Sequence, residues 1–449
     1  MKPKQKFAAL TLSASLLLSG IVLMPADFNG PITAEAAKPG NPAAFDQKVI
    51  ARIDGQRIYE DVRKLSVEIG PRVAGTEPER AAADMIYNRL KSYGYEMEIQ
   101  EFSIPDTMVG HLATSAGNEV KVAIPSGSGV TPAEGLTAPL YDAGLGTPAE
   151  FSAEAAGKIA LIRRGEIGFR EKIDNAANAG AVAVLIYDNS EQSAPPNMSI
   201  GADAPLPVGG IRKASGEALL QDVIPGNGTV TLKVDALQGQ KSRNVIAKRT
   251  PKKVSNPDIV YVSAHFDSVP LAPGASDNAS GTATALEIAR VLKSYPIDKE
   301  IRFVFVGAEE IGLLGSEYYV SELSREEKAR SLTNYNMDMV GTSWENATAI
   351  YLNTVDGRSN LSTESAMAAA ARIGTPSELI LYQRGASDHV SFHEAGIPAV
   401  NFIRREPGTA SLEPYYHSPE DTIEYISQER LKEAGDLVGS AVYSVIRSN

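Results

Sequence analysis

Apolar and polar residues recur along the chain with two periods, and these periods predict its helices and strands. Apolar residues fall at helical spacing over residues 53–65 and again over residues 77–93, and a loop over residues 70–76 separates the two segments. Residues 95–104 alternate between apolar and polar and predict a strand. Residues 37–50 show neither period, so we expect a flexible start there.

The composition of the sequence and its pattern of predicted elements change twice further along the chain. Residues 110–241 are rich in Gly, Ala and Pro, with short strands and a small βαβ unit formed by a strand (158–163), a helix (169–179) and a strand (181–187). After that segment, short apolar strands alternate with helices. We expect strands at residues 259–264, 301–306, 349–352 and 399–402, and helices near residues 281–295, 317–330, 362–373 and 428–446.

This alternation predicts an α/β fold, in which helices cover both faces of a mostly parallel sheet. The different texture of residues 110–241 predicts an inserted domain, so residues 37–109 and 242–449 would form one discontinuous domain. The length of 449 residues agrees with this division, because about 150 residues per domain gives two or three domains.

Residues 1–36 have the pattern of a signal peptide. Lys2, Lys4 and Lys6 precede an uncharged apolar run over residues 7–25, and residues 34–36 supply the small residues of a cleavage site. The alternative is an uncleaved membrane anchor, because the apolar run is long for a signal peptide. No later segment of the sequence is apolar enough to span a bilayer. We expect a cleaved, secreted, extracellular protein with no membrane partner.

The composition of the chain excludes several kinds of binding partner and of reactive site. The formal net charge of -12 argues against binding to nucleic acid and to anionic membranes. The chain has no cysteine, which excludes disulfides, thiolate nucleophiles and Cys-ligated zinc. A metal site must therefore use Asp, Glu and the five histidines, which are His111, His265, His389, His393 and His417.

Several of these side chains follow predicted strands, where ligands gather in open α/β sheets. His265 follows the strand at residues 259–264, and it is either a metal ligand or a structural residue. Asp267, two residues further on, can accept the other imidazole N–H of His265. Glu309 and Glu310 follow the strand at residues 301–306, and Asp338 fits a strand end. As an isolated pair, Glu309 and Glu310 can also be surface or helix-start acids.

Two further residues lie in polar loops. Asp277 precedes a helix and is either its N-cap or a carboxylate that bridges two metals. His417 precedes the last helices. Together the candidates form five ligands of nitrogen and oxygen type, and a bridging Asp277 would give each ion one His, one terminal carboxylate and an open position. This composition is typical of a catalytic zinc site. The five candidates are His265, Asp277, Glu310, Asp338 and His417.

Six motifs in this order resemble the co-catalytic di-zinc aminopeptidase family. They are HFDS (265–268), GASDNASG (274–281), LEIAR (286–290), EEIGLLGS (309–316), NMDM (336–339) and YHSPEDT (416–422). The runs GKIALIRRG (157–165) and KIDNAANAGA (172–181) are similar to the protease-associated (PA) domain. The whole arrangement resembles secreted aminopeptidases of Gram-positive bacteria. It implies a zinc exopeptidase fold of the phosphorylase/hydrolase-like kind, with a β-rich PA insert.

The resemblance also implies the metals. Two zinc ions are expected, one bound by His265 and Asp338 and the other by Glu310 and His417, with Asp277 shared between them. The substrates would be the N-termini of peptides and proteins. Calcium is conceivable for an acidic extracellular protein, but no loop signature supports it.

The resemblance assigns catalytic roles as well. Glu309 would act as the general base, Tyr416 would help to hold the oxyanion, and Asp267 would orient His265. A cis peptide bond between Asp277 and Asn278 is also implied. Two departures from the family pattern are Ile167, where the PA domain usually has a cysteine, and Ala386, where some members have an arginine. Here the nearest arginine is two positions further back, at residue 384.

The remaining histidines carry weaker expectations. His393-Glu394 resembles half of a His-Glu-x-x-His zinc motif, but the position of the second histidine holds Ile397, which excludes that motif. His389 either lines the site or is structural, and His111 is expected in a loop.

Other functions fit the sequence less well than that of an aminopeptidase. The chain lacks the Gly-x-Ser-x-Gly pentapeptide of serine hydrolases with an α/β-hydrolase fold. A carboxypeptidase or dipeptidase of the same fold stays open, because such enzymes hold a substrate carboxylate with cations, for which Arg384, Arg404 and Arg405 are candidates. A non-enzymatic receptor with a peptidase fold would be expected to lose metal ligands, and all five are present.

Overall fold

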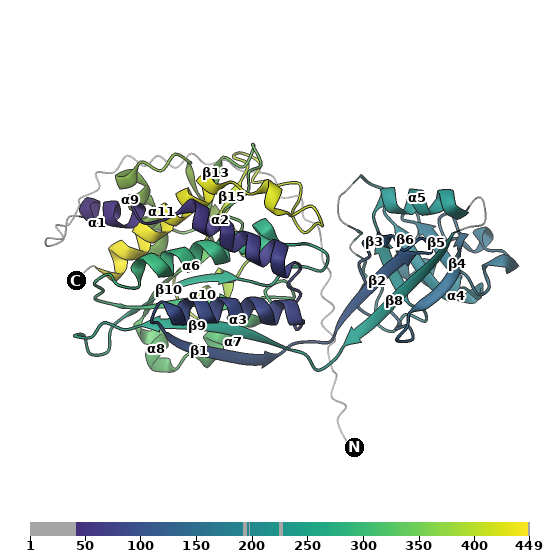
Figure 1. Ribbon diagram of the computed structural model, residues 1–449, viewed down its shortest axis with the longest axis horizontal. Coiled ribbons are helices and arrows are strands. Elements are labelled where there is room, and N and C mark those ends of the chain that lie inside the picture. The colour runs from purple at the N-terminus through teal and green to yellow at the C-terminus, as the bar shows by residue number, and fades with distance from the viewer. Residues whose placement is uncertain (1–41, 192–194, 197, 224–227, 448–449) are drawn as a thin grey trace, which may run out of the picture. The chain divides into compact units, whose positions relative to one another are not determined.

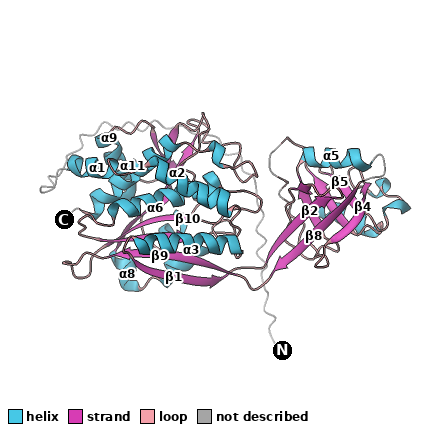
Figure 2. Ribbon diagram, in the orientation of Figure 1, coloured by secondary structure: helices cyan, strands magenta, loops and turns pink. Residues whose placement is uncertain are grey.

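The fold consists of two β-sheets with their own helices (Figures 1 and 2). A computed structural model describes residues 42–191, 195–196, 198–223 and 228–447. The expected signal peptide, residues 1–36, lies outside these ranges. Among the helices within them, none combines the length and apolar character needed to cross a membrane.

The first sheet has eight strands in the order β1-β9-β11-β10-β12-β15-β13-β14. Its centre is parallel, because β11, β10, β12 and β15 run in the same direction. β9 and β1 on one side and β13 on the other pair antiparallel with their inner neighbours, and β14 pairs parallel with β13, so the sheet as a whole is mixed. The strands are β1 (Glu96–Ser103), β9 (Lys241–Arg249), β10 (Ile259–His265), β11 (Glu300–Val306), β12 (Ser331–Met337), β13 (Ala349–Thr354), β14 (Leu379–Gln383) and β15 (Ala399–Arg405).

Helices cover both faces of this sheet, which explains why its strands β10 and β11 are mostly apolar. Every residue of β10 and β11 is buried. Val260 and Val262 of β10 belong to one large core, whereas Ile259 and Tyr261 belong to another on the opposite face. The first core packs against α1 (Pro42–Ile50), α2 (Gly55–Arg63), α3 (Glu77–Ser92), α6 (Gly281–Leu292), α9 (Leu361–Ile373) and α11 (Gln428–Ile446). The second packs against α7 (Leu314–Glu322) and α10 (His389–Glu394).

The second sheet has seven strands in the order β3-β2-β8-β4-β5-β6-β7. It is inserted between β1 and β9, which pair with each other, so the chain leaves the first sheet and returns to it at the same place. Its strands are β2 (Thr107–Thr114), β3 (Glu119–Val120), β4 (Leu136–Asp142), β5 (Ile159–Arg163), β6 (Ala183–Tyr187), β7 (Val208–Ile211) and β8 (Thr229–Leu237), and its helices are α4 (Phe169–Asn178) and α5 (Lys213–Val223).

The remaining elements are short. One is a π-helical segment, Lys64–Ile69, which continues α2, and another is the kinked segment Ala275–Ser280, which precedes α6 and in which Asp277 and Asn278 are not helical. Three are 3₁₀ turns, at Pro148–Glu150, Ala153–Ala155 and Ile423–Tyr425. The helix α8 (Arg325–Arg330) leads into β12.

The structure corrects three of the sequence expectations. Residues 42–50 form a helix rather than a flexible start, because Val49 is buried in the core and the carboxylate of Asp46 accepts a 2.6 Å hydrogen bond from Arg372. The helix expected over residues 317–330 is divided into α7 and α8 at Leu323, whose backbone is extended. His111 lies in the strand β2 and not in a loop.

Candidate metal centre

The candidate site lies where neighbouring parallel strands end. His265 is the last residue of β10, Glu309 and Glu310 follow β11, and Asp338 follows β12. Because β10 lies between β11 and β12 and is parallel to both, these three strand ends meet at one edge of the sheet. The sheet thus brings together side chains that lie far apart in the sequence.

Asp277 lies between two histidines. Its Oδ1 is 3.3 Å from His265 Nε2, and its Oδ2 is 3.1 Å from His417 Nε2. His265 Nε2 is also 3.5 Å from Asp338 Oδ1, and His417 Nε2 is 3.0 Å from Glu310 Oε2. The five candidate ligands therefore form two groups that share Asp277, and within each group the ligand atoms lie within 4.8 Å of one another.

These side chains fit a metal centre. Glu310 Oε1 and Asp338 Oδ1 are buried and have no hydrogen-bond donor among the described residues. A buried carboxylate oxygen without a partner is costly, and a cation supplies the missing partner. A set of imidazole nitrogens and carboxylate oxygens with positions left open suits catalytic zinc.

The same crowding shifts the pKa values of the site. Burial, followed by the charge of Asp277, raises the pKa of Glu310 to about 7. Burial also raises the pKa of Glu309 well above its usual range. Burial lowers the pKa of His417, but its hydrogen bonds to Asp277 and Glu310 outweigh that effect and raise the pKa to about 10. A bound dication would favour the ionised carboxylates and the neutral imidazole.

Asp267 holds the loop that carries the two glutamates. Its carboxylate oxygens accept the backbone N–H groups of Glu309 and Glu310, each at 3.2 Å. Oδ1 of Asp267 also lies 3.5 Å from His265 Nδ1. Asp267 therefore fixes the backbone of Glu309 and Glu310, and its role in orienting His265 stays a prediction.

A second buried carboxylate, which the sequence did not reveal, does the same for Asp277. Asp421 accepts the backbone N–H groups of Ser276 and Asp277 at 2.7 and 3.0 Å. Burial, followed by the charge of Glu413, raises the pKa of Asp421 well above its usual range. Asp421 belongs to the YHSPEDT run that contains His417, so its position was visible in the sequence but its partners were not.

Asn278 links the Asp277 segment to the end of β12. Its Oδ1 accepts the N–H groups of Gly281 and Met339, and its Nδ2 donates to the Met337 carbonyl at 2.9 Å. The peptide bond between Asp277 and Asn278 is cis, as the resemblance implied. The amide of Asn278 thereby fixes the segment that carries Asp277 against the segment that carries Asp338.

Arg72 supports the backbone around the site and forms no hydrogen bond with a candidate metal ligand. Its fully buried guanidinium donates to five backbone carbonyls, which belong to residues 65, 70, 266, 273 and 274. Burial lowers its pKa to about 10, although the charges of Asp421 and Asp267 favour the cation. Arg72 therefore connects the segment that follows β10 with the segment that precedes Asp277.

A hollow opens beside the candidate ligands. Tyr416 lines it, and the Tyr416 ring stacks on His417 with centroids 3.8 Å apart. Burial, followed by the charge of Asp277, raises the pKa of Tyr416, so its hydroxyl stays protonated and can donate. The other lining residues are Asp277, Glu309, Glu310, Asp338, Met339, Arg384, Ala386, Ile403, Arg405, Leu412 and His417.

The other histidines do not line this hollow. His389 is buried, with Nε2 at 2.9 Å from the Arg384 carbonyl oxygen, and burial lowers its pKa to about 4. His393 lines a different hollow, together with Asp356 and Arg358. His111 lies beside Glu119 in the second sheet.

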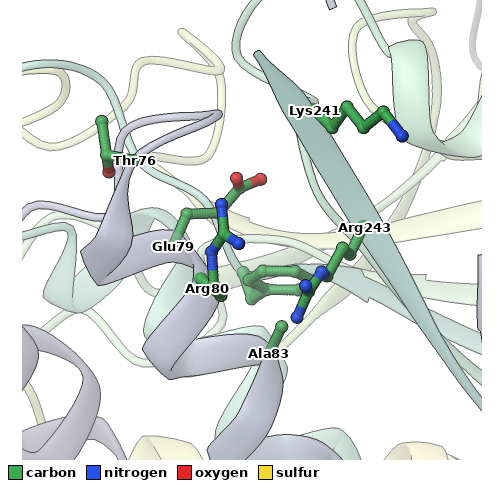
Figure 3. A pocket seen from close by; sticks show the side chains of 7 residues that line it. Thr76, Glu79, Arg80, Ala83, Lys241 and Arg243 are labelled. Atoms are coloured by element: carbon green, nitrogen blue, oxygen red, sulfur yellow. The ribbon is translucent and has the colours of Figure 1, made fainter. Parts of the chain in front are cut away.

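A small second pocket adjoins the residue that follows His265. Figure 3 shows Glu79 and Arg80 on α3 beside the strand that carries Lys241 and Arg243, and Phe266 also lines the pocket. The Glu79 carboxylate accepts hydrogen bonds from the Ser242 hydroxyl and from the Gly75 N–H. Burial raises the pKa of Glu79 to about 8. None of the five candidate ligands lines this pocket.

Two protein families match the chain. The model of Peptidase family M28 matches residues 244–442, and the model of the PA domain matches residues 128–219. All five candidate ligands fall within the first range.

Known proteins match over nearly the whole length. Aminopeptidase YwaD of Bacillus subtilis (strain 168) is 49% identical over 97% of this chain and 93% of its own. The probable lipoprotein aminopeptidase LpqL of Mycobacterium tuberculosis is 30% identical over 92% of this chain and 87% of its own.

Two solved structures of aminopeptidases are also similar to this chain. BSAP, a zinc aminopeptidase from Bacillus subtilis, superimposes with a TM-score of 0.72 at 50% identity, over 88% of this chain and 96% of that one. An aminopeptidase from Aneurinibacillus sp. strain AM-1 gives a TM-score of 0.61 at 38% identity, over 90% of this chain and 97% of that one.

Proposed function

The chain belongs to peptidase family M28 and is a zinc aminopeptidase, and we propose that it uses two zinc ions which share Asp277. One observation carries this proposal. The two carboxylate oxygens of Asp277 face different histidines, His265 at 3.3 Å and His417 at 3.1 Å. A carboxylate in this position can serve two cations at once. His265 and Asp338 would hold one ion, and Glu310 and His417 the other.

When bound, the two ions would lower the pKa of water and polarise the scissile carbonyl. Glu309 lines the hollow and is not needed as a ligand in either group. It would take a proton from the attacking water, whose oxygen forms a bond to the carbonyl carbon. As the C–N bond breaks, Glu309 would return that proton to the leaving amine nitrogen.

Neighbouring residues would assist this transfer. The protonated hydroxyl of Tyr416 would donate a hydrogen bond to the carbonyl oxygen as it gains negative charge. Asp267 would keep Glu309 in position, because its carboxylate accepts the Glu309 N–H at 3.2 Å.

The acids of the hollow also explain the choice of the amino end. A free α-ammonium group would pair with them, which places the first peptide carbonyl at the reacting groups. A peptide with an acetylated N-terminus cannot form that pair, so it should be cleaved slowly. Rapid cleavage of the acetylated peptide would contradict this account of substrate binding.

We further propose that the protein is secreted, with residues 1–36 removed. The PA domain would comprise residues 110–241, and the peptidase domain residues 37–109 and 242–449. Mass spectrometry of the protein from culture medium would test the cleavage site, for which we expect an N-terminus at residue 37.

The decisive test is hydrolysis of a leucyl chromogenic amide, combined with counting of the metal. We expect activity that a chelator abolishes and added zinc restores, with two zinc ions per chain in the active protein. An Asp277→Asn variant should bind less than two. Full activity with one zinc per chain would contradict the shared site while leaving the aminopeptidase itself intact.

A further inference from the structure

The structure separates the three arginines that the sequence offered as holders of a substrate carboxylate. Arg404 and Arg405 are adjacent on β15, so their side chains leave opposite faces of the sheet. Arg404 donates to Glu433 Oε2 at 2.7 Å and to the Val340 carbonyl at 3.0 Å, and its charge is therefore paired. Arg405 instead lines the hollow beside the metal ligands, and so does Arg384.

Arg405 is a buried cation with unused donors. The residue is only 4% exposed. Its Nη1 donates to the Ala410 carbonyl at 2.8 Å, whereas its buried Nε has no acceptor among the described residues. No described carboxylate forms an ion pair with it. A buried guanidinium that faces a substrate hollow with free N–H groups is prepared for an acceptor from outside the chain.

Arg384 adds a second cation to the same hollow. It follows β14 at the surface, where its backbone N–H donates to the Thr354 carbonyl. Within the described ranges its guanidinium has no ion-pair partner either. Burial, followed by the charge of Arg384, lowers the pKa of Arg405 to about 10, which indicates that the two guanidiniums are close enough to repel each other. An anion between them would relieve that repulsion.

The charges of the groups that line the hollow also favour the binding of an anion. Four carboxylates line it, and the two zinc ions and the α-ammonium group of the substrate would pair with them. The two guanidiniums then leave an excess of positive charge beside the reacting groups. The wall near them is apolar, with Met339, Ile403 and Leu412. This combination suits a short aliphatic stem that ends in a carboxylate.

We propose that Arg384 and Arg405 form a binding site for a substrate carboxylate close to the scissile bond. This inference rests on the proposed aminopeptidase function and names the substrates that the site favours. The carboxylate can come from the side chain of an N-terminal Asp or Glu, or from the C-terminus of a dipeptide. In both cases a bidentate, charge-assisted pair with a guanidinium would supply the binding.

Two matched substrate pairs distinguish these sources. Glutamyl and glutaminyl p-nitroanilide differ only in the charge of the first side chain. The dipeptide Leu-Ala and its C-terminal amide differ only in the terminal carboxylate. For each pair, the ratio of kcat/KM for the charged substrate to that for the neutral one reports recognition of the carboxylate. Leucyl p-nitroanilide serves as the neutral reference.

The variants to compare are Arg405→Gln and Arg384→Gln, with Arg325→Gln as a control that removes an exposed arginine on α8. We expect each site variant to lower the ratio about 10-fold for at least one pair. The control should leave both ratios unchanged. The pair whose ratio falls identifies the source of the carboxylate.

Some results of these measurements would contradict the proposal. Unchanged ratios in both site variants would overturn the proposal, and so would an equal loss on charged and neutral substrates. Because Arg384 is exposed, Arg384→Gln decides the matter if Arg405→Gln does not fold. A wild-type protein with bound zinc that fails to cleave even the leucyl reference would instead contradict the proposed function.

Discussion

Two adjacent glutamates, Glu309 and Glu310, are proposed to have different roles, and their surroundings differ. Glu310 Oε2 lies 3.0 Å from His417 Nε2, whereas Glu309 belongs to neither of the two groups that share Asp277 and has a carboxylate oxygen within 4.8 Å of ligand atoms of His265 and Glu310. The backbone of both residues is held by one carboxylate, that of Asp267. A substitution at either position can therefore be compared with its neighbour under nearly the same structural disturbance.

We predict that Glu309→Ala lowers kcat by about 100- to 10,000-fold while the zinc content stays that of the wild type. The reason is that the variant loses the proton acceptor but no ligand. Metal analysis together with steady-state kinetics on a leucyl amide would measure both quantities. Glu310→Ala is the matched control and should lose zinc. Loss of zinc from Glu309→Ala would make Glu309 a ligand and refute its role as the base.

At the scale of elements, the site depends on how closely α6 approaches β12. A Cβ atom on Gly281, the first residue of α6, would lie 2.2 Å from the Met337 carbonyl oxygen. The Gly281 N–H also donates to the Asn278 side chain at 2.9 Å. Asp277 shortly precedes Gly281 in the sequence, and Asp338 directly follows Met337. The distance between helix and strand therefore sets the distance between two ligands.

Gly281→Ala should accordingly lower the free energy of unfolding by about 1–3 kcal/mol and weaken zinc binding as well. Denaturant unfolding and titration with a zinc-competing chelator would measure the two effects. Gly168→Ala is the control, because a Cβ on Gly168 meets nothing within 4 Å. If Gly281→Ala were as stable as the control and bound zinc as tightly, helix packing would not determine the metal geometry.

The elements also show what a sequence can reveal. β10 and β11 were predictable because each contains a run of apolar residues, and the candidate ligands at their ends followed from that prediction. β9 was missed because its sequence, KSRNVIAKR, mixes charged and apolar residues without a clear period. The helix α1 was missed because it is short and is held by distant partners, such as Arg372 for Asp46.

The supporting residues were missed for a related reason. Arg72, Asn278 and Asp421 act through hydrogen bonds to backbone atoms, most of them from distant segments. A backbone N–H or carbonyl is the same at every position, so it leaves no signal in the sequence to pair with these side chains. Metal ligands, in contrast, share a narrow choice of residue types, which is why candidates for them could be collected from the sequence alone.

At the scale of the whole molecule, stability depends on pH through buried carboxyl groups such as Glu79. This residue is 3% exposed, and burial raises its pKa from 4.5 to about 8. Between these two pH values the unfolded chain has released the proton while the folded chain keeps it. The unfolded state thus binds fewer protons, and the free energy of unfolding falls as pH rises through this window.

We predict that Glu79→Gln makes the stability less dependent on pH between about 4.5 and 8. In the wild type this group alone contributes a fall of up to about 1.4 kcal/mol per pH unit, and glutamine cannot ionise. Denaturant unfolding of both proteins at pH 5 and pH 8 would measure the difference, which should favour the variant at the higher pH. Parallel curves would show that Glu79 is ionised in the folded protein.

Zinc should stabilise one part of the molecule and not the other. The two sheets have separate hydrophobic cores, and all five candidate ligands belong to the segment that forms the first sheet and its helices. A ligand that binds only the folded state stabilises it by about 4 kcal/mol when its concentration is 1,000 times its Kd. That stabilisation reaches only the cooperative unit that contains the site.

We therefore expect two unfolding transitions in calorimetry, of which a chelator lowers the Tm of one and leaves the other unchanged. Added zinc should restore the first. The zinc-independent transition should belong to residues 107–237, so limited proteolysis of the chelated protein at a temperature between the two midpoints should leave that segment intact. An equal shift of both transitions would mean that the inserted sheet and the peptidase domain unfold as one unit, so that zinc binding stabilises the entire chain.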